Sequence, residues 1–254
     1  MISFSEAQIA AWMSPVLWPF LRVLGMFTTA PIFSVRSIPV RAKVALALLI
    51  AIAAQPSLTG QPVIGVDSPG AFGAVVQQVG VGMAIGFAVR LVFGAVELAG
   101  ELIGLQMGLG FASFFNPASG GQANAVSSFL GQISLLLFIV VNGHLTLLMA
   151  VIRSFQAFPA DGNILEMLGK TQIHRLGAEL FASAMWIALP MIALLVFINL
   201  ALGIISRVAP QMNIYAIGFP ITLTVGMVGI AATLPMLDAP LLALMEKVVD
   251  LFIR

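Results

Sequence analysis

The chain has 254 residues, of which 60% are hydrophobic and only 8% are charged, and its mean hydropathy is +1.09. Soluble domains carry about 25% charged residues, so a soluble fold of this length could not bury so much apolar surface. A net charge of +1 excludes a large basic surface for binding nucleic acid. The composition therefore predicts an all-α integral membrane protein without a separate soluble domain.

About six hydrophobic segments are expected to form helices, because a membrane span needs roughly 20 apolar residues. The first contains Pro15, Pro19 and Arg22, which predicts a kinked helix with one charge to satisfy. The second is short for a full span, and the fourth is interrupted at Asn142-Gly143-His144. The expected segments are 9–33, 44–54, 71–105, 125–152, 176–205 and 214–237.

The third segment carries three charges, Arg90, Glu97 and Glu101, at a spacing that places them on one helix face. Charges within a membrane normally face a bundle interior or a wet cavity. The segment is also longer than a span requires, so the two glutamates could lie on an interfacial part of the helix. The sequence leaves both interpretations open.

A loop follows this segment. Gly100, Gly104 and Gly108 share a helix face, which allows another helix to approach closely. After Gly110 come three phenylalanines, Asn-Pro and Gly-Gly, which favour a loop. Loop backbone is tolerated at membrane depth only where protein buries it or where it lines an aqueous path. The segment is therefore either a loop at a pore or an ordinary connector at the membrane surface.

Three other features complete the chain. The glycines of the GVGMAIG stretch, Gly82 and Gly86, are expected to pack against a neighbouring helix. Residues 153–175 form the most polar loop, in which Ile164, Leu165 and Leu168 suggest a short amphipathic helix. Residues 238–254 read as an amphipathic helix. The last two spans form a hairpin whose tight polar turn holds Arg207, Pro210, Gln211 and Asn213.

The sequence contains no pattern typical of a catalytic site. It contains no Walker loop and no cluster of His, Asp and Glu at metal-ligand spacing, and no serine is paired with a base. GVGMAIG fails the dinucleotide-binding pattern because Ile85 stands where the third glycine should be. We therefore expect no catalytic residues, no cofactor and no metal.

Several motifs together resemble the FliR family of bacterial type III export proteins. They are RVLGMFTTAPIFSVRSIPVRAKVALA near the N-terminus, GELIGLQMGLGF followed by Asn116-Pro117, then NGH, and the run 189–226. The resemblance covers almost the whole chain, and the run 189–226 is its most specific part.

The resemblance implies a subunit of the flagellar export gate in the bacterial inner membrane, at the flagellar basal body. Its implied partners are FliP-like and FliQ-like gate subunits, an FlhB-like switch protein, unfolded export substrates in transit and membrane lipid. By the same analogy, residues 1–175 form a FliP-like part, and residues 176–254 form a FliQ-like helical hairpin with the C-terminal helix.

The resemblance also implies that loop 106–122 plugs the closed pore. The apolar plug would include the phenylalanines with Met107 and Leu109, and glycines such as Gly108 would let it swing aside. Candidate subunit contacts are Arg207, Gln211 and Asn213. The implied plug residues are Gln106, Met107, Gly108, Leu109, Gly110, Phe111, Phe114, Phe115, Asn116 and Pro117.

Two alternatives accompany this interpretation. One is the homologous export gate of a virulence secretion system. The other is a self-contained transporter or channel for small solutes, in which Arg90, Glu97 and Glu101 would bind ions. Against the transporter, the sequence shows no clear inverted repeat and few ionisable groups within its hydrophobic segments.

Overall fold

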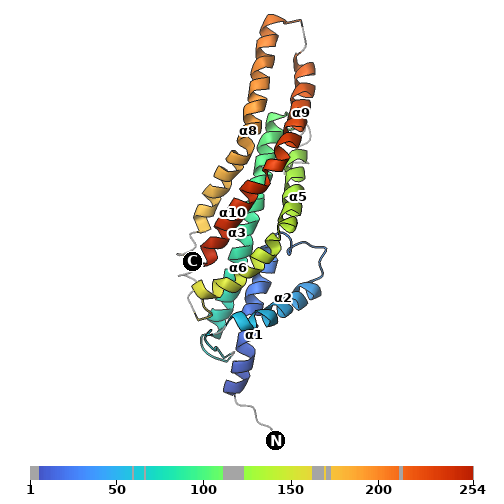
Figure 1. Cartoon of the computed structure of the whole chain (residues 1–254). Helices are drawn as coiled ribbons and strands as arrows, with labels where there is room; N and C mark the ends of the chain where they lie inside the picture. Colours follow the sequence, from blue (N-terminus) through green and yellow to red (C-terminus); the bar gives the residue numbers. More distant parts are fainter. Residues whose placement is uncertain are drawn as a thin grey trace. The chain divides into compact units, whose positions relative to one another are not determined.

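The computed structural model describes residues 6–58, 60–65, 67–110, 123–161, 169, 173–211 and 214–253. Within these residues the chain is helical and has no β-strand (Figure 1). The helices are α1 (Glu6–Thr29), α2 (Val40–Ala54), α3 (Ala71–Gln106), α5 (Ala125–Val140), α6 (Gly143–Ala157), α8 (Ile173–Val208), α9 (Ile214–Thr233) and α10 (Asp238–Ile253), with 3-10 turns η1 (Gln55–Ser57) and η3 (Leu234–Met236).

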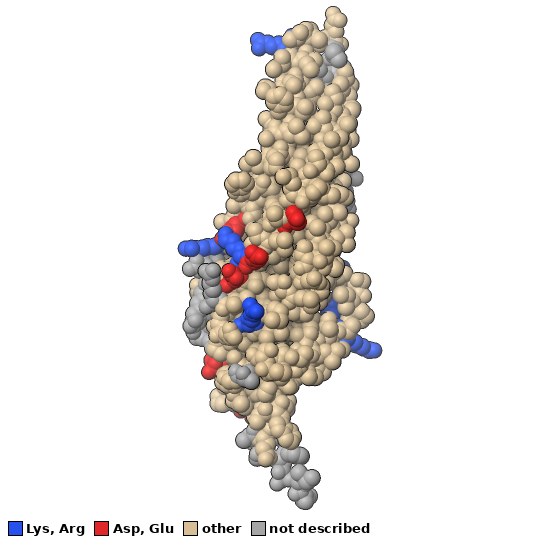
Figure 2. Space-filling model, viewed as in Figure 1, with Lys and Arg blue, Asp and Glu red and all other residues tan. Residues whose placement is uncertain are grey.

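The helices confirm an all-α membrane protein. Among the described residues, α1, α2 with η1, α3, α8, and α9 with η3 are long and apolar enough to cross a membrane. The pair α5 and α6 makes a sixth candidate, bent by 69° at the break. Asn142, at that break, has a left-handed backbone with φ of 57°, a conformation that asparagine tolerates better than most residues. Figure 2 shows few charges on the visible face.

Some predicted boundaries were wrong. Helix α2 begins at Val40, one turn before the predicted start. Arg153 lies within α6, which continues to Ala157, so the polar loop is shorter than predicted. Arg207 lies in the last turn of α8 and not in the connection after it. The amphipathic helix predicted at Ile164, Leu165 and Leu168 lies outside the described residues.

The chain divides into two compact units. Unit 1 comprises Met1–Leu91, Phe138–Leu176 and Leu244–Arg254, and unit 2 comprises Val92–Leu137 and Gly177–Ala243. Helix α3 therefore contributes its first part to unit 1 and its second part to unit 2. The division at residue 175 into FliP-like and FliQ-like parts describes a likeness to other proteins, and it stays a prediction.

Glycines bring α1 and α3 into close contact within unit 1. A Cβ added at Gly82 would overlap the Arg22 carbonyl oxygen, and one at Gly86 would lie 2.7 Å from the Met26 oxygen. From the other side, a Cβ at Gly25 would lie 2.5 Å from the Val79 oxygen. The predicted packing of Gly82 and Gly86 against a neighbouring helix is thus confirmed, as small residues allow in apolar surroundings.

The C-terminal helix α10 buries one stripe and exposes the other, as its spacing predicts. Leu241 and Met245 are buried, whereas the intervening Leu242 is exposed. Val248 and Phe252 continue the buried stripe one and two turns later.

Candidate functional site

The C-terminal end of α3, where the predicted plug loop begins, is a Schellman motif. Gly108 has a φ of 86°, which favours glycine. Its N–H donates to the Leu105 carbonyl at 3.0 Å, and the N–H of Leu109 donates to the Gly104 carbonyl at 3.0 Å. These two hydrogen bonds satisfy carbonyl groups that the helix end would leave free. Gly108 therefore ends α3 and sets the direction in which the chain leaves it.

Met107, the residue before this glycine, docks on α9. Its side chain is fully buried. A Cβ added at Gly226 would lie 2.6 Å from the Met107 Cγ, Sδ and Cε atoms, so a larger residue there would force the Met107 side chain to move. The hydroxyl of Thr222 lies 3.3 Å from the Met107 carbonyl oxygen, a bond it shares with the Gly218 carbonyl at 3.1 Å. Both contacts fix the start of the loop within unit 2.

Asn124 fixes the other end of the loop to the same part of α3. Its N–H donates to Glu101 Oε2 and its side-chain amide donates to the Glu101 carbonyl, each at 3.2 Å. Its Oδ1 accepts the Ser127 N–H at 2.8 Å, which is the bond of a helix N-cap. The Gly104 backbone contacts this side chain closely enough that a Cβ there would overlap it.

The described residues at the start of the predicted plug loop 106–122, and Asn124 after it, thus lie close together at the last two turns of α3. Loops whose ends are held this close are frequently functional. The sequence alone missed Asn124, Thr222 and Gly226 as parts of this site. Asn124 carried a usable signal, because asparagine directly before an apolar helix is a preferred N-cap. The predicted plug residues Phe111, Phe114, Phe115, Asn116 and Pro117 lie outside the described residues.

None of the three charges of α3 is buried. Arg90 and Glu97 are exposed, and Glu101 is half-buried. The Glu97 carbonyl accepts the Ser127 hydroxyl at 2.7 Å, so α5 packs on α3 at this point. The Glu101 carboxylate accepts the N–H of Asn124, as described above, so this side chain helps to hold Asn124 against α3.

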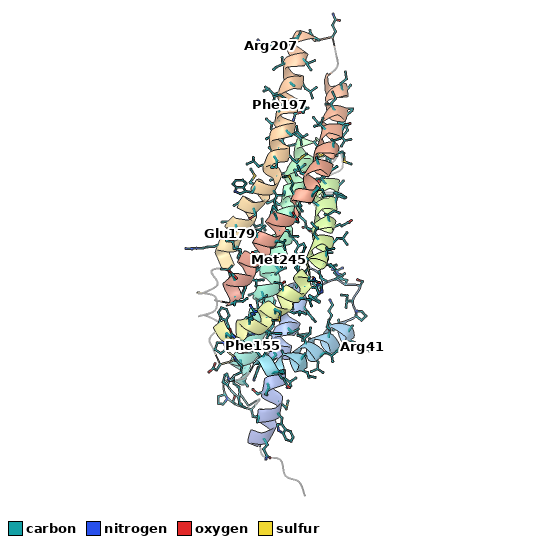
Figure 3. All side chains as sticks on the ribbon, viewed as in Figure 1. Arg41, Phe155, Glu179, Phe197, Arg207 and Met245 are labelled. Atoms are coloured by element: carbon teal, nitrogen blue, oxygen red, sulfur yellow. The ribbon has the colours of Figure 1, made fainter. Side chains whose placement is uncertain are left out.

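The hairpin turn between α8 and α9 places polar groups at an exposed tip of unit 2. Arg207, Pro210 and Gln211 are all exposed, and Figure 3 shows Arg207 at the end of α8. Asn213 lies outside the described residues. Along α8, large apolar side chains are exposed over several turns, among them Trp186 and Phe197. The hairpin therefore presents a long apolar surface that ends in a small polar tip.

Unit 1 has a buried cation at its centre. Arg22 is fully buried, its guanidinium lies 3.5 Å from the centroid of the Phe155 ring, and it donates to three neutral oxygens. The acceptors are Gln78 Oε1 and Ser154 Oγ at 2.8 Å each, and the Phe158 carbonyl oxygen. A cation on an aromatic face gains stability when it is desolvated. The sequence indicated that the charge of Arg22 needs hydrogen-bond partners, but it did not identify them.

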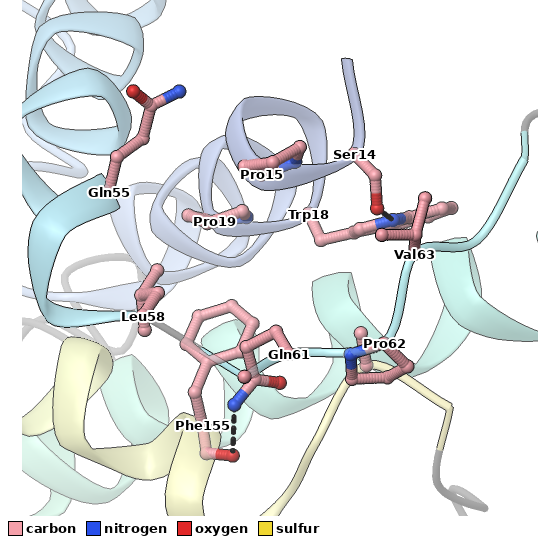
Figure 4. Close-up of a pocket in the computed structure, with 12 residues that line it drawn as sticks. Ser14, Pro15, Trp18, Pro19, Gln55, Leu58, Gln61, Pro62, Val63 and Phe155 are labelled. Atoms are coloured by element: carbon pink, nitrogen blue, oxygen red, sulfur yellow. Dashed lines mark hydrogen bonds between the residues drawn. The ribbon is translucent and has the colours of Figure 1, made fainter. Parts of the chain in front are cut away.

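A cavity of about 250 Å³ lies beside this centre in unit 1 (Figure 4). Trp18, Phe155 and three prolines line it. Its one hydroxyl, on Ser14, accepts the Trp18 Nε1–H at 2.8 Å and the Ile64 N–H at 3.2 Å. The described lining therefore offers packing surface and no acid–base pair.

The glycine beneath Met107 gives a direct test of the docking. Gly226→Ala is expected to lower the free energy of unfolding by about 1–3 kcal/mol, because the new Cβ must displace Met107. Gly203→Ala in α8 is the matched control, since nothing lies within 4 Å of a Cβ there. The thermal unfolding midpoint of the full chain in detergent reports both. Equal unfolding midpoints for Gly226→Ala and Gly203→Ala would contradict the packing of Met107 on Gly226.

Comparison with known proteins assigns the family. The family model described as bacterial export proteins, family 1, matches residues 13–248. Flagellar biosynthetic protein FliR of Escherichia coli (strain K12) is 42% identical over 237 residues, which cover 93% of this chain and 90% of that protein. FliR of Pectobacterium carotovorum is 38% identical over 99% of this chain and 96% of its own length. A more distant relative, FliR of Bacillus subtilis, is 29% identical over 82% of each chain. The chain therefore belongs to the bacterial export proteins of family 1, the family that contains FliR.

Proposed function

We propose that this chain is a subunit of the flagellar type III protein export gate. It would form part of the protein-conducting core with FliP-like and FliQ-like subunits in the inner membrane at the flagellar basal body, in contact with an FlhB-like switch protein. The similarity to FliR proteins along nearly the whole chain supports this role. All three relatives described above are flagellar proteins, which favours the flagellar over the virulence system.

The exposed apolar surface of α8 supports assembly with other subunits. Side chains as large as Trp186 and Phe197 are more than 60% exposed in the single chain. In the assembled gate, neighbouring helices would cover part of this surface, and Arg207 and Gln211 at the tip would make polar contacts between subunits. The chain would conduct protein and catalyse no reaction.

The observation that supports the gating part of the proposal is that Met107, at the start of the predicted plug loop 106–122, and Asn124, just after it, are both fixed to helices. Met107 packs on Gly226 of α9 and Asn124 donates hydrogen bonds to Glu101 of α3, so the residues at both ends of this segment are fixed to helices of unit 2. We propose that Phe111, Phe114 and Phe115 form an apolar seal in the closed gate. Apolar constrictions close a pore by excluding water.

Replacing the three phenylalanines by serine tests the seal while the loop keeps its length. The expected result is a several-fold rise in ion leak through the assembled gate, because a polar constriction stays hydrated. Deleting residues 111–122 and joining the ends by a short Gly-Ser linker should raise the leak further. Unchanged leak in both variants, with normal amounts of assembled gate, would contradict a plug. Arg175→Gln, an exposed residue of α8, is the control.

A further inference from the structure

The surface of unit 1 around α2 combines an apolar helix with a concentrated positive charge. From Val44 to the end of α2, the helix contains only alanine, leucine, isoleucine and valine. Ala47, Ala51 and Ala54 are buried, and α2 contacts α1. On the remaining faces Leu49 is 64% exposed, and Val44, Leu46, Leu48 and Ile52 are exposed as well.

This apolar surface extends around most of the helix. At 100° per residue, the exposed large side chains of α2 span more than half of its circumference. A helix that meets water normally has a polar face, whereas one that is apolar all round lies in protein or lipid. Figure 1 shows α2 running across α1 rather than alongside it, which leaves these faces open within unit 1.

The charge lies at one end of the same helix. Arg36 and Arg41 are exposed, and Figure 3 places Arg41 at the N-terminal end of α2. Lys43 is half-buried and donates one hydrogen bond, to the Val35 carbonyl at 3.1 Å. No Asp or Glu occurs in the sequence between Glu6 and Asp67, so no acidic residue nearby in the chain offsets these three charges.

We infer that α2 and this basic cluster bind an anionic phospholipid. The headgroup phosphate would lie at Arg36 and Arg41, and the acyl chains would lie along the apolar faces of α2. Together with η1 the helix covers residues 40–57, a segment long and apolar enough to cross a bilayer. A helix of that length reaches from the phosphate level into the acyl chains. An acidic protein partner would satisfy the charges but not the extended apolar surface beside them.

Binding of matched lipids to the full-length chain tests the inference. The chain, with any co-purifying subunits, is titrated in neutral detergent with phosphatidylglycerol or phosphatidylcholine of the same acyl chains, and native mass spectrometry counts the bound lipids. The wild type should prefer phosphatidylglycerol. Arg36→Gln with Arg41→Gln should weaken its binding roughly 10- to 30-fold, since each basic residue near an anionic surface contributes about fivefold.

The controls separate charge from fold and from acyl-chain contacts. Arg36→Lys with Arg41→Lys should keep the preference, and Arg153→Gln with Arg175→Gln removes two exposed charges elsewhere and should also keep it. Leu49→Gln should weaken the binding of phosphatidylglycerol and of phosphatidylcholine to a similar degree. Equal binding of the two lipids by the wild type, or a preference that survives Arg36→Gln with Arg41→Gln, would overturn the inference. So would a photo-crosslinker at position 41 that captures only a partner protein in native membranes.

Discussion

Replacing Arg22 by methionine is expected to destabilise the protein by about 2–4 kcal/mol, because buried acceptors left without a donor each cost about 1–3 kcal/mol. Gln78 Oε1, Ser154 Oγ and the Phe158 carbonyl would all lose the guanidinium. Removal of a costly buried charge offsets part of this loss. The unfolding midpoint of the full chain in detergent should fall by roughly 5–15 °C.

A compensated variant distinguishes the lost hydrogen bonds from lost packing. Combining Arg22→Met with Gln78→Met and Ser154→Ala removes two of the stranded acceptors and should recover part of the midpoint. The single change Arg153→Gln, at an exposed position of α6, should leave the midpoint unchanged. A wild-type midpoint for Arg22→Met alone would show that the buried network contributes nothing to stability.

Gly82→Ala is also expected to destabilise the protein, because it forces two backbones apart. The added Cβ would overlap the Arg22 carbonyl oxygen and lie 2.9 Å from the Met26 nitrogen. Backbone atoms cannot rotate away, so α1 would have to move off α3 and carry Arg22 with it. Overpacking of this kind costs about 1–3 kcal/mol and occasionally more. The unfolding midpoint and the fraction of monodisperse protein measure the effect.

Gly73→Ala in the same helix is the matched control. Nothing lies within 4 Å of a Cβ at Gly73. Alanine is favoured over glycine in a helix by about 1 kcal/mol, so this variant should be neutral or slightly more stable. Equal unfolding midpoints for Gly82→Ala and Gly73→Ala would contradict the close approach of α1 and α3 at Gly82.

Where proline, glycine or Asn-Gly marks a boundary, the sequence predicted the ends of helices well. The third segment, 71–105, differs by one residue from α3, because Pro69-Gly70 breaks the chain before it and Gly108 ends it. The interruption of the fourth segment was also visible, since Asn-Gly favours a left-handed turn. Its 69° bend was not, because a bend angle depends on what each half packs against.

The sequence alone could not predict the contacts within the Arg22 network or those that hold Met107. Arg22 and Ser154 are separated by 132 positions, and Thr222 and Met107 by 115. No local pattern distinguishes Ser154 from the other serines, or Gly226 from other glycines in apolar helices. Similarity to FliR proteins shows the family, whereas the three-dimensional structure shows which residues hold Met107, Asn124 and the buried Arg22 in place.

The mass of the intact complex that co-purifies with the tagged chain from its native membrane tests the export-gate role most directly. The account predicts a large assembly that contains FliP-like and FliQ-like subunits and that loses its integrity when the exposed face of α8 is made polar at Phe197. A lone chain or homodimer that stays stable and binds a small solute would contradict the account, and it would return attention to Arg90, Glu97 and Glu101.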